Sequence, residues 1–111
     1  MLPTCTVTAR FTRNDEPVQG LVRFTPSRLW VVRDGITWAC LAPEVRLSED
    51  GSFTVEVTPT DTDPVWWRYL IETPAGWWEA SIPHNEAGYT LRGLVGEHHP
   101  GSRAAYGRRA L

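Results

Sequence analysis

The chain has 111 residues, a formal net charge of −2 and 41% hydrophobic residues, including six tryptophans. This length fits one domain that can bury a core without metal or disulfide staples. The small net charge argues against nucleic-acid binding by the chain as a whole, and no stretch approaches the ~20 apolar residues of a membrane span. The first residues carry no basic region followed by an apolar run, so we expect no signal peptide and synthesis in a reducing cytoplasm.

Alternation of apolar and polar residues predicts short strands through the first half of the chain. An Asp34-Gly35 pair separates two apolar runs, which is a strong signal for a hairpin. A second tight turn is expected at Glu49-Asp50-Gly51. The expected strands are residues 4–12, 18–25, 29–32, 36–41, 44–47 and 53–57.

The second half of the chain continues the pattern. A proline-rich loop at 58–64 precedes a long strand expected at 65–73, and a turn at 74–76 leads into a further strand at 77–82. Residues 89–95 fit either an edge strand or a turn of helix. Short strands without helical periodicity predict an all-β fold, a single antiparallel β-sandwich. We expect residues 1–95 to form this domain and residues 96–111 to form an extended basic C-terminal arm.

The alternating register also predicts which side chains face the core. In each strand, every second residue is expected to point to the dry face of the sheet. The predicted core residues are Phe11, Phe24, Phe53, Val55, Trp67, Tyr69, Ile71, Trp78 and Ile82.

Two pairs of adjacent tryptophans are the sharpest feature of the sequence. Neighbouring residues of a strand point to opposite faces, so one member of each pair is expected outside the core. The register assigns Trp66 and Trp77 to the outer face, together with Arg68, Leu70 and Glu79. Exposed aromatic residues mark a contact surface, for either a protein or a sugar. The alternative is that a loop such as 26–34, or the C-terminal arm, covers them.

The C-terminal arm differs in charge from the rest of the chain. Residues 1–96 carry a net charge of −4, whereas residues 97–111 carry +2. Arginine forms charge-assisted hydrogen bonds with carboxylates. We therefore expect the arm to anchor on a neighbouring subunit; its predicted partner-binding residues are Arg103, Tyr106, Arg108 and Arg109.

No motif for catalysis or metal binding is found. His98 and His99 are adjacent, which is a poor arrangement for ligating one metal, and no Gly-x-Ser-x-Gly motif is present. We expect no metal, no cofactor and no enzymatic activity. Cys5 and Cys40 lie in segments with strand patterns, where a free thiol usually behaves as a small buried hydrophobe. A disulfide between the two is the alternative.

Several segments, taken in order, resemble a known family. A strand ends in Phe24-Thr25-Pro26, a hairpin carries Asp50-Gly51-Ser52-Phe53, and a later strand carries Trp67-x-Tyr69. In this order they resemble the small prealbumin-like β-sandwich domains of tail and head structural proteins from phages that infect actinobacteria. The resemblance covers about residues 4–95. It rests on the segments 18–26, 47–55, 67–72, 80–83 and 91–94.

The resemblance implies a virion structural protein, made in the host bacterial cytoplasm. It implies a minor tail protein held non-covalently by other virion proteins, the tail or capsid subunits. Copies of the chain itself are a further candidate partner. A decoration protein on the outside of the capsid is the alternative placement. A hypothesis of another class is a carbohydrate-binding module that stacks host cell-wall glycans on Trp66 and Trp77. Neither nucleic acid nor membrane is an expected partner, and the family motifs carry no catalytic residue.

Overall fold

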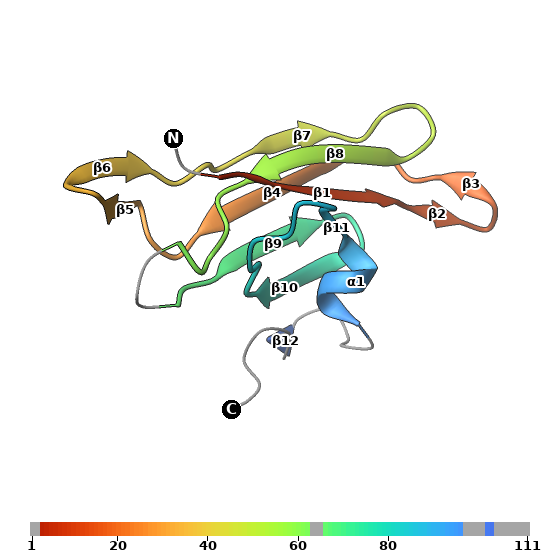
Figure 1. The fold of residues 1–111 in the computed structure, drawn as a ribbon. Helices are drawn as coiled ribbons and strands as arrows, with labels where there is room; N and C mark the ends of the chain where they lie inside the picture. Colours follow the sequence, from red (N-terminus) through yellow and green to blue (C-terminus); the bar gives the residue numbers. More distant parts are fainter. Residues whose placement is uncertain (1–2, 63–65, 97–101, 104–111) are drawn as a thin grey trace.

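The computed structural model describes residues 3–62, 66–96 and 102–103, and two β-sheets pack face to face in it around one core (Figure 1). This arrangement confirms the predicted all-β sandwich. A three-stranded sheet has the order β11 (Tyr89–Thr90), β1 (Cys5–Arg10) and β8 (Ser52–Val57). A five-stranded sheet has the order β12 (Ser102–Arg103), β10 (Gly76–Ala80), β9 (Tyr69–Thr73), β4 (Leu21–Pro26) and β7 (Glu44–Arg46).

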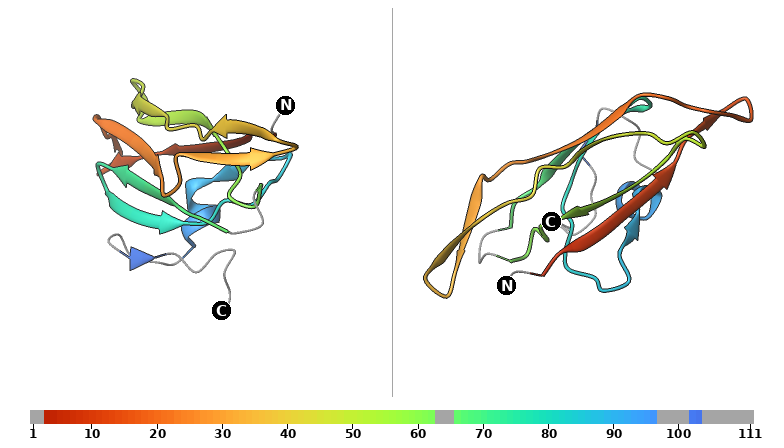
Figure 2. Two further views of the ribbon diagram at one scale, coloured as in Figure 1. Left: turned by 90° about the vertical axis from the view of Figure 1, so that its left-hand side faces the viewer. Right: turned by 90° about the horizontal axis from the view of Figure 1, so that it is seen from above.

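Two hairpins extend from opposite ends of the sandwich (Figure 2). One joins β2 (Thr12–Arg13) to β3 (Glu16–Pro17), and the other joins β5 (Trp30–Arg33) to β6 (Ile36–Ala39). At the turn of the second hairpin, Asp34 and Gly35 have φ angles of 53° and 75°. Two-residue hairpin turns of this kind need positive φ at both central positions, which Asp-Gly adopts readily. The hairpin predicted from Asp34-Gly35 is therefore confirmed.

The predicted turn at Glu49-Asp50-Gly51 leads into β8 and closes tightly against another strand end. Gly51 has a φ of 81°, and a Cβ atom built on it would lie 2.3 Å from the carbonyl oxygen of Phe11. The Phe11 N–H in turn donates to the Gly51 carbonyl at 2.9 Å. Only glycine allows this approach of two backbones, so Gly51 fixes how the start of β8 meets the end of β1.

The strand predicted at 65–73 is wrong in its first part, because β9 begins only at Tyr69. Trp66 to Arg68 belong to no strand. The Arg68 N–H donates to the side-chain oxygen of Ser27 at 3.0 Å, while the Ser27 N–H donates to the Arg68 carbonyl at 2.8 Å. A serine hydroxyl thus takes the place of a backbone acceptor, which ends the regular ladder at this point.

Residues 89–95 were expected to form either an edge strand or a turn of helix, and the segment contains both in succession. After β11, which pairs in parallel with β1, the chain forms the short helix α1 (Leu91–Val95). The Thr90 side chain caps this helix by accepting a hydrogen bond from the Gly93 N–H at 3.0 Å. The helix lies against β1 and β10 and closes one side of the sandwich. Within the described ranges, no helix has the length and apolar character needed to span a membrane.

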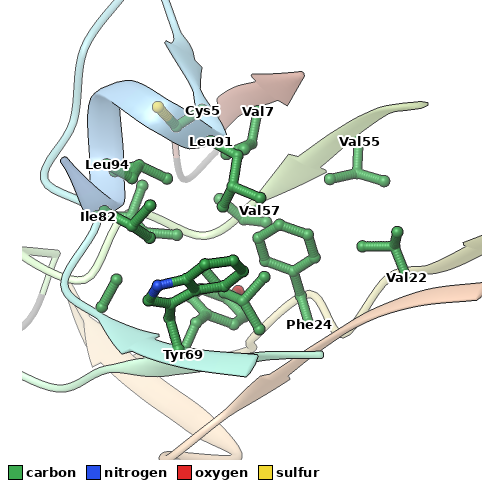
Figure 3. Packing of buried hydrophobic residues seen from close by; sticks show 14 of the residues in the cluster. Cys5, Val7, Val22, Phe24, Val55, Val57, Tyr69, Ile82, Leu91 and Leu94 are labelled. Carbon is green, nitrogen blue, oxygen red and sulfur yellow. The ribbon is translucent and has the colours of Figure 1, made fainter. Parts of the chain in front are cut away.

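The core is a continuous cluster of side chains from both sheets (Figure 3). Eight of the nine residues predicted for it are buried, and Phe11 is the exception, since it is only partly buried and packs against the edge of the cluster. The rings of Phe24 and Phe53 connect the two sheets, with their centroids 6.0 Å apart. The Phe24 ring also lies 6.0 Å from that of Tyr69, which belongs to the same sheet as Phe24. Phe11 falls within the strand predicted at 4–12 but outside β1, which ends at Arg10.

Tyr69 ties three segments together through its hydroxyl group. The residue is fully buried, and its hydroxyl donates to the Leu41 carbonyl at 2.6 Å and accepts from the Thr58 N–H at 3.0 Å. Leu41 follows the β5–β6 hairpin, and Thr58 follows β8. Burial raises the pKa of Tyr69 to about 12. The neutral phenol is therefore the form that the fold requires.

We expect Tyr69→Phe to lower the free energy of unfolding by about 1–3 kcal/mol, because it leaves a buried N–H and a carbonyl without a partner. Stability should also depend on alkaline pH. The unfolded tyrosine ionises near pH 10 and the folded one near 12, so the stability from this group is complete below pH 10 and is lost as pH rises to about 12. Urea titrations from pH 8 to 12 measure both effects. A Tyr69→Phe variant as stable as the parent, or an equal alkaline loss in both, contradicts this account.

Candidate functional site

The described residues contain no group of three or more His, Cys, Asp or Glu side chains that could hold a metal ion. His84 is exposed, and its backbone N–H donates to Asp61 Oδ1 at 3.1 Å. This bond gives Asp61 a role in capping a loop. His98, His99 and Asp63 lie outside the described residues.

The two cysteines are packing residues of the core. Both are buried, and no disulfide joins Cys5 to Cys40. Burial raises the pKa of the Cys5 thiol, whose sulfur lies 3.6 Å from the Asn85 carbonyl oxygen. A thiol with a raised pKa is a poor nucleophile at neutral pH, which argues against a chemical role for Cys5.

The outer face of the five-stranded sheet carries a partly apolar surface around Trp77. Leu70, Glu72, Trp77 and Glu79 line a shallow pocket there, and the Trp77 side chain is 43% exposed. Glu72 lies directly opposite Trp77 in the β9–β10 hairpin. We call these four residues the Trp77 surface. The register prediction placed Trp77, Leu70 and Glu79 on one outer face, and the structure has them together.

Trp66 does not share this surface. Its side chain is 49% exposed, but the chain continues away from Trp77 at this end of β9, as the paired hydrogen bonds between Arg68 and Ser27 show. Trp66 precedes the start of β9, whereas Trp77 stands beside the turn that joins β9 to β10, and Trp66 does not line the pocket around Trp77. The two rings therefore lie toward opposite ends of the β9–β10 hairpin, and they do not form one stacking platform. Both rings stay exposed over almost half of their surface.

Arg68, predicted to lie beside these tryptophans on the outer face, is only partly exposed. Its Nε atom is buried and has no hydrogen-bond partner among the described residues. Its backbone is held by Ser27. Arg68 therefore contributes less to an open surface than the strand register predicted.

The most exposed apolar side chains belong to the β5–β6 hairpin and the residue before it. Leu29 is 70% exposed, Trp30 55%, Val32 54% and Ile36 53%. Leu29, Trp30 and Val32 line a shallow pocket together with Arg28. Val31 points to the face opposite Trp30 and Val32 and is buried, and its cross-strand neighbour Trp38 packs against the core. Ile36 lies on the same face as Val31 but next to the turn, where it is exposed. We call the four exposed side chains the hairpin patch.

Sequence reasoning identified this hairpin but missed its exposed patch. Leu29, Trp30, Val31 and Val32 are four consecutive apolar residues. In a strand, such a run places apolar side chains on both faces. This run of apolar residues was the signal in the sequence for an exposed patch, because a two-stranded hairpin can pack only one of its faces against the sandwich.

A further apolar pocket, of about 340 Å³, lies between β1 and α1. Phe11, Trp78, Leu91 and Val95 line it, with Arg10 at its rim. The Arg10 guanidinium donates to the backbone carbonyl of Asp50 at 3.2 Å. This bond holds the Arg10 side chain to the turn that precedes β8. The pocket offers space for an apolar group and was not predicted.

Of the C-terminal arm, the structure describes Gly96, which caps the end of α1, and Ser102–Arg103. Ser102–Arg103 forms β12 and pairs in parallel with β10 of the same chain. Glu79 is the Cα partner of Arg103 in this pairing. The backbone at Arg103 thus contacts the chain's own sheet. Tyr106, Arg108 and Arg109, the other predicted contacts of the arm, lie outside the described residues.

Comparison with known proteins adds no relative to this picture. No protein-family model matches the chain, and no curated protein sequence matches it. The interpretation of its surfaces therefore depends on the sandwich itself and on what it exposes.

Proposed function

We propose that this protein is a structural protein of a phage virion, a minor tail protein that attaches non-covalently to neighbouring virion proteins. In this proposal it acts by binding alone, without catalysis or a cofactor. The observation that carries the proposal is the hairpin patch, in which three large apolar side chains of a hairpin that extends from the sandwich are exposed, together with Leu29 just before it. Apolar side chains concentrated in this way mark a protein contact.

The placement in a virion is supported by the resemblance in sequence, whose motifs fall on structural elements. Phe24-Thr25-Pro26 ends β4, Asp50-Gly51-Ser52-Phe53 forms the turn into β8, and Tyr69 begins β9. These residues build the sandwich and carry no chemistry. A decoration protein on the capsid exterior uses the same features, so tail and capsid are distinguished only by experiment.

Locating the protein in purified phage particles tests the proposal. We expect an antibody against the protein, or a tag placed at its N-terminus, to label the tail in electron micrographs. Labelling of the head surface would instead support the role of a decoration protein on the capsid exterior. Particles that contain no copy of the protein, detected by mass spectrometry, would contradict the virion role.

Deletion of residues 97–111 tests the C-terminal arm. We expect the truncated domain to stay folded, because the deletion removes only the two-residue β12 from the edge of the described sheet. It should no longer join the particle, since the arginines that would pair with acidic groups of a neighbour are lost. A variant with Arg103, Arg108 and Arg109 changed to Lys keeps the charge and serves as the control. Normal incorporation of the truncated protein would show that the arm is not an anchor.

The carbohydrate-binding alternative predicts a saturable change in tryptophan fluorescence when soluble host cell-wall glycans are added. We expect no such change, because Trp66 and Trp77 lie apart and the Trp77 surface offers a single exposed ring. Sugar sites normally combine aromatic rings with several converging polar groups. A saturable response in the parent that disappears in the double variant Trp66→Ala, Trp77→Ala would favour the binding module over the structural protein.

A further inference from the structure

We propose that copies of this chain bind one another head to tail, with the β5–β6 hairpin of one copy seated on the Trp77 surface of the next. The inference rests on the structural role proposed above and names one partner for it, a second copy of this chain. It follows from two surfaces of the same molecule that match in apolar character and in charge.

The donor is the tip of the hairpin, formed by Val32, Arg33 and Ile36. Ile36 lies directly opposite Arg33 in the hairpin register, so the two share one face, whereas Val32 lies on the other face. Val32 and Ile36 are both exposed, so each face of the tip carries an apolar side chain. The base of the hairpin is fixed to the body of the protein by Val31 and Trp38. A two-stranded hairpin is only marginally stable alone, so this anchoring presents the tip in a defined position.

The acceptor is the Trp77 surface, which combines two apolar side chains, Leu70 and Trp77, with two carboxylates, Glu72 and Glu79. Trp77 is the side chain with most area to lose from water, since it is nearly half exposed. Aromatic residues at the centre of an interface usually contribute most of its affinity. The pocket is shallow, which suits the narrow tip of a hairpin better than a small ligand.

Charge supports this pairing of donor and acceptor. Arg33 forms no ion pair with any residue that the structure describes. Glu72 stands beside Arg23, which is already bound to Glu44 at 2.6 Å. An arginine brought beside Glu72 would gain a carboxylate partner, and the resulting complementarity would also set the orientation of the contact.

The position of the two surfaces makes the contact heterologous. The hairpin leaves the sandwich beyond Pro26, which pairs with Tyr69 at the start of β9, whereas Glu72 and Trp77 lie toward the other end of the β9–β10 hairpin. The hairpin extends away from the Trp77 surface of its own chain, so it is available to another copy. Contacts between two different surfaces generate rings or filaments, depending on the rotation between copies.

Sedimentation velocity of the full chain at rising protein concentration tests the proposal. We expect oligomers that dissociate on dilution. Trp77→Ser should weaken association by about 30-fold or more, as the loss of a central aromatic contact does. Val32→Ser combined with Ile36→Ser, which removes the apolar side chains of the donor, should weaken it as well. Trp66→Ser is the matched control, because it removes a tryptophan of similar exposure that belongs to neither surface. Circular dichroism and thermal unfolding verify that each variant is folded.

Mixing the two weakened variants distinguishes this contact from others. The hairpin variant keeps its acceptor and the Trp77→Ser variant keeps its hairpin, so together they should form a 1:1 heterodimer and nothing larger. A contact between two identical surfaces would not be restored by mixing. Charge exchange gives a second check: Arg33→Glu alone should disrupt association, and Arg33→Glu combined with Glu72→Arg should restore it.

A parent protein that stays monomeric, a mixture that stays monomeric, or equal weakening by Trp66→Ser would each overturn the inference. Binding of a monomeric parent to lipid vesicles would do so as well, since the hairpin patch would then serve a membrane. These outcomes are separate from those for the proposed function. A protein found in the tail that does not self-associate retains its virion role, whereas a self-associating protein absent from particles retains the contact.

Discussion

The hydroxyl group of Tyr69 is the interaction on which the geometry of this molecule depends. From the five-stranded sheet it reaches the backbone just after β8 in the three-stranded sheet and the backbone just after the β5–β6 hairpin. A buried hydroxyl must find partners or destabilise the fold, so these two bonds set the spacing of the sheets and the direction of the hairpin together. The most exposed part of the protein is thus positioned by one of its most buried residues.

The sandwich could be predicted because its determinants are local in the sequence. Strand faces follow from alternation, and the hairpin turn from Asp34-Gly35. The errors in strand boundaries arose where contacts between residues distant in the sequence determine the local structure. Trp66 to Arg68 alternate like a strand, yet the chain there bonds to Ser27, and Phe11 fits the core pattern but lies where β1 has ended. No local pattern reports which distant residue will supply a hydrogen-bond partner.

The candidate surfaces were predicted less well, for a related reason. Adjacent tryptophans correctly indicated that one member of each pair is exposed, but strand parity does not give the distance between Trp66 and Trp77 along the sheet. That distance depends on where β9 starts. The hairpin patch was missed because exposure depends on whether another segment covers a strand, and β5 and β6 have the body of the protein on one face only.

In the β5–β6 hairpin, the residues that stabilise the fold differ from the residues that are exposed for recognition. Val31 and Trp38 hold it to the body, whereas Trp30, Val32 and Ile36 contribute little to the fold because they stay in water. Substitutions at the exposed positions can therefore change what the hairpin recognises at small cost in stability. Related chains could diverge in their choice of neighbour through these few residues while the sandwich beneath them is conserved.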